Sequence, residues 1–339
     1  MKGLKEMKKK GFLIGFIIFC LLLSAGYGVG VYFVNYALSP VSNSDQRVID
    51  EDEQINILEG SQKQIALNKQ TEGKKAEDFE KTTKPMIVAA NDSIALKGKY
   101  LMQKENHHMW TILIHGYKSN HSNMMSYGAA YYEKGYHVVL PDNRAHGKSE
   151  GELIGMGWLD KDDIACWVDW IVKKDPQAKI ILHGVSMGGA TVMMCAGDQL
   201  EHVVGYVEDC GYTSVWDIFA SELEKRFHLP TFPILDISNL VARLKAGYDF
   251  KEASSIEQLK KNDKPILFIH GGKDDFVPTE MVYEVYKATN APKDLYLVEE
   301  AGHAEAKDYN PQAYWDKVFQ FIDQKIEINN YSLFFSICN

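Results

Sequence analysis

The chain has 339 residues, of which 45% are hydrophobic and 24% charged, and its formal net charge is −9. This near-average composition excludes a largely disordered, collagen-like or coiled-coil protein. The acidic balance excludes nucleic acid as a partner, because phosphate backbones require a basic surface. The charge is uneven, since the first ten residues hold five Lys and one Glu, a net +4 that leaves −13 for the rest.

Residues 11–38 follow this basic end and carry no charged side chain. About 20 apolar residues are enough for a helix to cross the hydrocarbon core, so we expect a transmembrane signal anchor there. The lysines keep residues 1–10 as a cytoplasmic tail and place the rest outside the cytoplasm, by the positive-inside rule. The alternative is secretion after signal cleavage, near Ser24, Ala25 and Gly26. Removal of residues 1–38 is expected to release a soluble, active domain.

Residues 39–84 are polar and read as a stalk. From residue 85, short apolar runs alternate with helical patterns, which predicts an α/β domain over 85–327 with a mostly parallel, eight-stranded sheet and helices on both faces. Strands are expected at 86–89, 94–101, 110–115, 137–140, 179–183, 203–207, 265–270 and 294–298, and helices at 122–134, 160–174, 187–200, 279–289 and 311–325. Residues 328–339 form a C-terminal tail without an assigned role.

The alternation lapses between residues 213 and 250, where six aromatic residues and two prolines occur. This insertion predicts a short helical lid at about 213–250, or else an ordinary crossover whose aromatic side chains face the core. The five cysteines form no CxxC pair, so neither a metal site nor a dense disulfide framework is expected. A single disulfide in an external domain stays open.

The sharpest local signal is the GxSxG string of residues 184–188, centred on Ser186. A strand pattern precedes it and a helical pattern follows it. Such a tight strand-to-helix turn holds a serine hydroxyl out of the sheet at the positive end of the helix. We therefore expect Ser186 to be a nucleophile.

A serine nucleophile needs a base and an acid that orients the base. Asp274 follows the seventh predicted strand and His303 follows the eighth, so the order Ser186, Asp274, His303 suits this task. Asp275 and Asp209 are the alternative acids. Asp209, directly after the sixth strand, is interpreted as a helix cap or loop anchor.

Five ordered motifs make residues 85–325 resemble the α/β-hydrolase superfamily. They are Ile114-His115-Gly116-Tyr117, the run PDNRAHGKS at 141–149, the serine turn, HGGKDDFVP at 270–278 and Gly302-His303. Within it, the chain is most similar to membrane-anchored bacterial serine hydrolases, grouped with serine-aminopeptidase-like and prolyl-oligopeptidase-like esterases. The resemblance implies catalysis by Ser186, Asp274 and His303 without a cofactor. It also implies an oxyanion hole made by the backbone N–H groups of Tyr117 and Met187. Ala145 departs from the family, which usually has Gly there.

These residues predict a serine hydrolase that cleaves carboxylic esters, either acyl or lipid-derived, through an acyl-enzyme. A peptidase or amidase of the serine-aminopeptidase-like type is the alternative. A non-catalytic, membrane-anchored binding protein on the same fold is a second alternative. The expected partners are a small-molecule ester or peptide substrate and the lipid bilayer.

Overall fold

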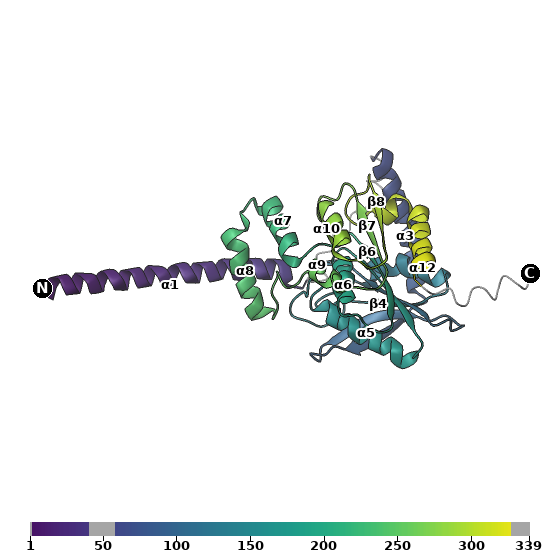
Figure 1. Ribbon diagram of the computed structural model, residues 1–339, viewed down its shortest axis with the longest axis horizontal. Coiled ribbons are helices and arrows are strands. Elements are labelled where there is room, and N and C mark those ends of the chain that lie inside the picture. Colours follow the sequence, from purple (N-terminus) through teal and green to yellow (C-terminus); the bar gives the residue numbers. More distant parts are fainter. Residues whose placement is uncertain (1, 41–57, 327–339) are drawn as a thin grey trace, which may run out of the picture.

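The structure is a computed structural model that describes residues 2–40 and 58–326. Part of the predicted stalk, residues 41–57, and the predicted tail, residues 328–339, lie outside the described residues. Figure 1 shows a layered body from which one long helix projects.

The body is built on a single eight-stranded sheet in the order β1-β2-β4-β3-β5-β6-β7-β8. Strands β1 and β2 pair antiparallel, β2 joins β4 antiparallel, and all further pairs are parallel. Their bounds are β1 Lys84–Ala89, β2 Ala95–Leu101, β3 Met109–Ile114, β4 His137–Pro141, β5 Lys179–Val185, β6 Val203–Asp209, β7 Ile266–Gly271 and β8 Lys293–Val298. The eight predicted strands and the mostly parallel sheet are confirmed.

Helices cover both faces of this sheet, as predicted. One face carries η2 His121–Met124, α4 Met125–Glu133, α11 Ala306–Tyr309 and α12 Pro311–Lys325; the other carries α5 Asp160–Lys174, α6 Met187–Ala196, α9 Ser255–Leu259 and α10 Glu280–Ala288. Because strand side chains alternate, Ile180 and Leu182 enter one core cluster while Ile181 enters the other. The core therefore lies on both sides of the sheet.

Helix α3, Gly60–Glu80, differs from the expected stalk. Its Ile65, Glu72 and Phe79 are buried, seven residues apart on one face, and Phe79 belongs to the core cluster beneath α4. The Asn68 side chain also donates to the Asp308 backbone oxygen over 2.8 Å. Residues 60–80 are therefore part of the domain. Only one narrow stripe of this helix is buried, so the composition of the segment stays polar and predicts a stalk.

Helix α1, Lys2–Leu38, is both a projecting helix and a part of the body (Figure 1). Residues 10–25 are exposed along their whole length, whereas Gly30, Val34 and Leu38 are buried. The buried stretch packs with α7, Val215–Phe227, and α8, Thr231–Lys245, which form the predicted lid segment. The separate anchor and hydrolase domain expected from the sequence are thus joined at the end of α1.

Candidate active site

Ser186 sits at the sharp turn between β5 and α6, with φ 59° and ψ −118°. The flanking glycines are a steric requirement of this turn. A Cβ on Gly184 would lie 2.1 Å from the Gly188 carbonyl oxygen, and one on Gly188 would lie 2.0 Å from the Ile114 carbonyl oxygen. The left-handed backbone of Ser186 is strained for a residue with a side chain. The turn presents its hydroxyl above the sheet, as the GxSxG string predicts.

The structure brings Ser186, His303 and Asp274 together in one hydrogen-bonded chain. The His303 Nε2 lies 2.8 Å from Ser186 Oγ, and His303 Nδ1 lies 2.8 Å from Asp274 Oδ2. Backbone N–H groups of Phe276 and Val277 donate to Asp274 Oδ1 over 3.0 and 2.8 Å. The carboxylate is therefore fixed on one side by backbone donors and directed at the imidazole on the other.

Neither alternative acid takes this place. The Asp275 backbone oxygen accepts a bond from Lys225, and the His303 ring bonds its neighbour Asp274. Asp209 is buried at the end of β6 and accepts a 2.9 Å bond from the Tyr314 hydroxyl of α12. Its other oxygen has no hydrogen-bond partner within the described part of the chain. Burial raises the pKa of Asp209 to about 7.

Cys210 lies next to Asp274 and His303. Its sulfur and the side-chain ligand atoms of Asp274 and His303 all lie within 4.8 Å of one another, a grouping that suits a metal ion by residue type. Both His303 ring nitrogens, however, already face Ser186 Oγ and Asp274 Oδ2 at hydrogen-bond distance. Burial also raises the pKa of the Cys210 thiol well above its usual value, which disfavours the thiolate that a metal requires. The arrangement therefore suits proton transfer better than metal ligation.

The two predicted oxyanion donors flank Ser186. Met187 is the first residue of α6, where a backbone N–H has no partner within the helix. The Tyr117 loop follows β3, and a Cβ on Gly116 would lie 3.3 Å from the Ser186 Cβ. The neutral His115 ring holds this loop: it bonds the Gly116 oxygen over 2.8 Å and accepts from the Asn143 N–H over 2.9 Å. Burial lowers the pKa of His115 to about 3.

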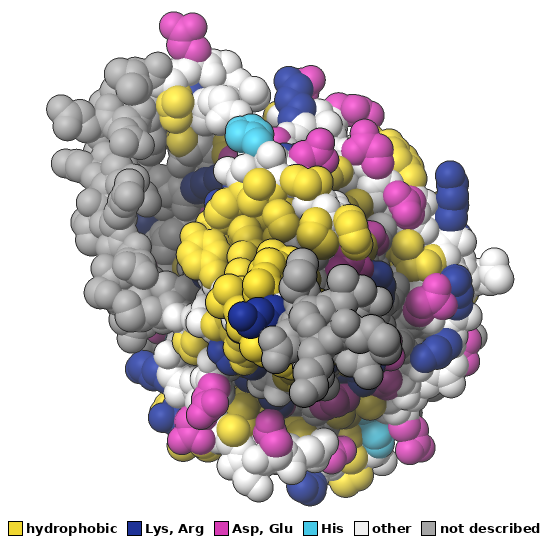
Figure 2. Space-filling model, turned by 90° about the vertical axis from the view of Figure 1, so that its left-hand side faces the viewer, with side chains coloured by type: hydrophobic (Ala, Val, Ile, Leu, Met, Phe, Trp, Pro, Cys, Tyr) yellow, Lys and Arg dark blue, Asp and Glu magenta, His cyan; other side chains and the backbone are white. Residues whose placement is uncertain are grey.

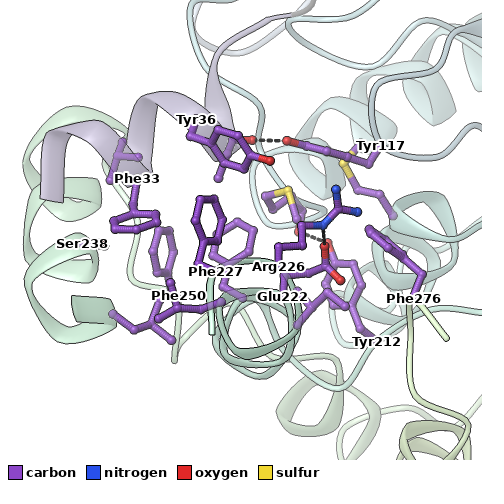
Figure 3. Close-up of a pocket in the computed structure, with 18 of the residues that line it drawn as sticks. Phe33, Tyr36, Tyr117, Tyr212, Glu222, Arg226, Phe227, Ser238, Phe250 and Phe276 are labelled. Atoms are coloured by element: carbon purple, nitrogen blue, oxygen red, sulfur yellow. Dashed lines mark hydrogen bonds and ion pairs between the residues drawn. The ribbon is translucent and has the colours of Figure 1, made fainter. Parts of the chain in front are cut away.

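An apolar cavity of about 330 Å³ opens beside Ser186 and Met187 (Figure 3). Its walls come from α7 and α8, the two helices of the segment for which a lid was one of two predictions, and also from Phe33, Val34, Tyr36 and Ala37 of α1. The Phe33 ring meets the Phe227 ring edge-on at 5.2 Å. The α1 residues carry no sequence signal for this role, because a membrane span fully explains an uncharged run at a chain end.

Ser186 and His303 also line a second, more polar cavity of about 600 Å³. Residues of α3 line it, including Lys69 and Glu72, together with Lys307 of α11. Ser186 thus lies where an apolar space and a polar space meet. No local motif predicts the second cavity, because the polar composition of residues 60–80 indicates a stalk.

Comparison with known proteins agrees with this fold. Residues 105–231 match a family model described as Hydrolase_4, serine aminopeptidase S33. The uncharacterized protein YqkD of Bacillus subtilis is 29% identical over 73% of this chain and 81% of its own length.

Among solved structures, the Pyrococcus furiosus esterase Pf2001 matches with a TM-score of 0.60 and 22% identity, over 74% of this chain and 95% of that one. The Pyrococcus horikoshii acylaminoacyl peptidase matches with a TM-score of 0.56 and 18% identity, over 74% of this chain and 43% of that one. At these identities the solved structures establish a common fold. They include both an esterase and a peptidase.

Proposed function

On the premise that this chain has the α/β-hydrolase fold, we propose that it is a serine hydrolase that cleaves carboxylic esters. The observation that carries the proposal is the continuous chain from Ser186 through His303 to Asp274, with 2.8 Å at both links. Ser186, at one end of this hydrogen-bonded series, lines an apolar cavity. A serine, an imidazole and a buried carboxylate so arranged can perform acyl transfer to water.

In this mechanism, His303 Nε2 removes the Ser186 proton as Oγ attacks the ester carbonyl carbon. The N–H groups of Met187 and Tyr117 stabilise the resulting oxyanion. His303 then donates its proton to the leaving alcohol, and the C–O bond breaks to give an acyl-serine. A water molecule, deprotonated by His303, attacks this acyl group and releases the acid. Asp274 orients the imidazole and stabilises its charged form.

The lining of the cavity favours esters over peptides. An aminopeptidase needs a free carboxylate to bind the substrate ammonium group, and Glu222 is the acidic residue that lines the apolar cavity. Glu222 is already paired with Arg226 (Figure 3). The remaining walls are mainly aliphatic and aromatic, which suits an acyl chain. A serine peptidase stays as the second candidate because a peptidase is among the matching structures.

The first test is labelling with a fluorophosphonate probe, comparing the wild type with Ser186→Ala. We expect labelling that depends wholly on Ser186, whereas folded wild type without labelling would point to a non-catalytic binding protein. Rates on p-nitrophenyl esters of graded chain length are then compared with rates on aminoacyl p-nitroanilides. Faster cleavage of the anilides by orders of magnitude would replace the ester assignment with a peptidase.

We also propose that α1 is an uncleaved signal anchor, with its lysines in the cytoplasm and the catalytic domain outside. Within the described residues, Lys10–Leu38 is the helix long and apolar enough to cross a membrane. A membrane-impermeant fluorophosphonate should label Ser186 in intact cells, and the labelled protein should keep the mass of the full chain. Labelling only after lysis would reverse the orientation, and a shortened, released protein would indicate signal cleavage.

A further inference from the structure

The end of α1 packs against the lid helix α8 through small residues. A Cβ on Gly30 would lie 2.7 Å from Val241 Cγ2 and 3.0 Å from Ile237 Cγ2, and one on Gly26 would lie 3.5 Å from Ile237 Cδ1. Two glycines four residues apart let helices approach closely, as they do between membrane helices. Helix α1 and the lid therefore form one packed unit.

The catalytic domain also caps the last turn of α1, where carbonyl groups lack partners within the helix. The Tyr117 hydroxyl donates to the Ala37 oxygen over 2.6 Å. The Ile154 N–H donates to the Leu38 oxygen over 2.7 Å. Tyr117 belongs to the proposed oxyanion loop, so the end of α1 is fixed directly to the active site.

The length of α1 places the lid at the membrane surface. Residues 11–25 are exposed and span only about 22 Å at 1.5 Å per residue, less than the ~30 Å of a hydrocarbon core. The hydrocarbon core must therefore include the turns of α1 that contact α8. Helix α8 exposes Phe232, Leu240 and Leu244, with 76%, 58% and 72% of their surfaces accessible. Figure 2, seen from the N-terminal side of α1, shows hydrophobic side chains gathered around the projecting helix.

The apolar cavity lies behind this surface. Phe33, Val34 and Ala37 of α1 line this cavity, and so does Ser186. The polar cavity beside Ser186 is lined by charged residues of α3 and by Lys307. An amphiphilic ester fits this division, because its acyl chain suits the apolar cavity and its alcohol suits the polar one.

We propose that the outer end of α1 is a wall of the acyl-binding site, and that the substrate is a long-chain acyl ester of a polar alcohol that resides in the adjoining leaflet. This inference rests on the proposed ester hydrolase activity and specifies its substrate class. The anchor then both holds the enzyme at the membrane and shapes the site. In the bound state, the acyl chain occupies the apolar cavity that α1, α7 and α8 line beside Ser186.

The test uses the full chain reconstituted into dioleoylphosphatidylglycerol vesicles, with oleate release as the long-chain reaction and p-nitrophenyl acetate cleavage as the short-chain reaction. Ala37→Phe places a larger side chain in the wall of the proposed acyl site. Ile18→Phe makes a matched change at an exposed position of the same helix. We expect Ala37→Phe to lower the long-to-short ratio of kcat/KM by at least about 10-fold. Ile18→Phe should leave that ratio unchanged. The inference would be overturned if the Ala37→Phe protein is still labelled by the fluorophosphonate and has an unchanged long-to-short ratio.

A second variant does not depend on repacking. Leu240→Glu combined with Leu244→Glu places charges on exposed lid positions, so oleate release should fall relative to acetate cleavage. Equal rates on vesicles for this variant and the wild type would contradict immersion of the lid. The two proposals fail separately: a wild type that cleaves neither substrate removes the ester hydrolase assignment. A wild type that cleaves the acetate ester and releases no oleate removes only the lipid substrate.

Discussion

Two adjacent aspartates after β7 have different surroundings. The Asp274 side chain is fully buried between backbone donors and His303, whereas the Lys225 bond to Asp275 is made by its backbone oxygen. We expect Asp274→Asn to lower kcat for an ester substrate by about 10³ to 10⁴, because an amide cannot stabilise the charged imidazole. Asp275→Asn is the matched control and should stay within about twofold of wild type. Steady-state kinetics decide, and the reverse pattern would assign the acid to Asp275.

Asp209 gives the protein a pH dependence of stability. Its pKa is about 7 in the folded state against about 3.9 in an unfolded chain, so the folded state binds this proton more tightly. Folding stability from this group is therefore highest below pH 4 and falls as the pH rises to 7. Asp209→Asn removes this titration.

The free energy of unfolding is measured for Asp209→Asn and wild type from pH 4 to pH 8 in detergent. The stability of the variant relative to wild type should increase as the pH rises to 7. The gain should be at most about 4 kcal/mol and should level off above pH 7. Titrations shared by both proteins cancel in this difference. A difference that does not change with pH would show that Asp209 is ionised throughout.

The grouping of Ser186, Asp274 and His303 could be predicted because their motifs are local and follow the strand order. The GxSxG string specifies its own turn, since the glycines exclude side chains from it. Asp209 was predictable as an anchor but not in its contact, because its partner Tyr314 lies 105 residues away on α12. The cavity walls from α1 depend on packing between distant segments, which no local pattern encodes.

At the scale of elements, α3 tests how much a polar helix contributes to the fold. Phe79 lies against the position of Gly128 on α4, where a Cβ would meet the ring at 2.6 Å. Phe79→Ala should destabilise the domain by about 3 kcal/mol, through lost burial and the cavity left behind. This corresponds to a fall in Tm of roughly 6 to 12 °C for a domain of this size.

Lys74→Ala is the control for this measurement, because Lys74 is exposed on the same helix. Its Tm should match wild type, as measured by thermal unfolding in detergent. An unchanged Tm for Phe79→Ala would mean that residues 60–80 do not stabilise the domain and are a stalk. All eight strands could be predicted, because short runs rich in apolar residues lie between turn residues. Helix α3 could not, because a single buried stripe barely changes the composition of a polar segment.

At the scale of the whole molecule, the net charge of −9 is the sum of +4 on the first ten residues and −13 on the rest. The expectation that this remainder is a self-sufficient soluble domain conflicts with the packing of α1. Val241 and Leu235 of α8 are 1% and 4% exposed in the core cluster that contains Val34 and Leu38. Deleting α1 would expose them and leave the Ile154 N–H without its acceptor. The packed body therefore extends into α1, so we expect the proposed catalytic unit to begin within α1 rather than after it.

Two truncations locate this boundary. A protein lacking residues 1–25 loses the exposed part of α1 but keeps Gly30, Val34 and Leu38 against the lid. A protein lacking residues 1–38 loses both.

We expect the shorter deletion to run as a monodisperse species in mild detergent and to react with a fluorophosphonate at about the wild-type rate. The longer deletion should aggregate or react much more slowly, because the exposed apolar lid favours association and the Tyr117 loop loses its bond to Ala37. Size-exclusion chromatography with labelling kinetics decides. Equal solubility and labelling of the two proteins would mean that α1 only tethers the enzyme, and the acyl site would then be complete without the membrane helix.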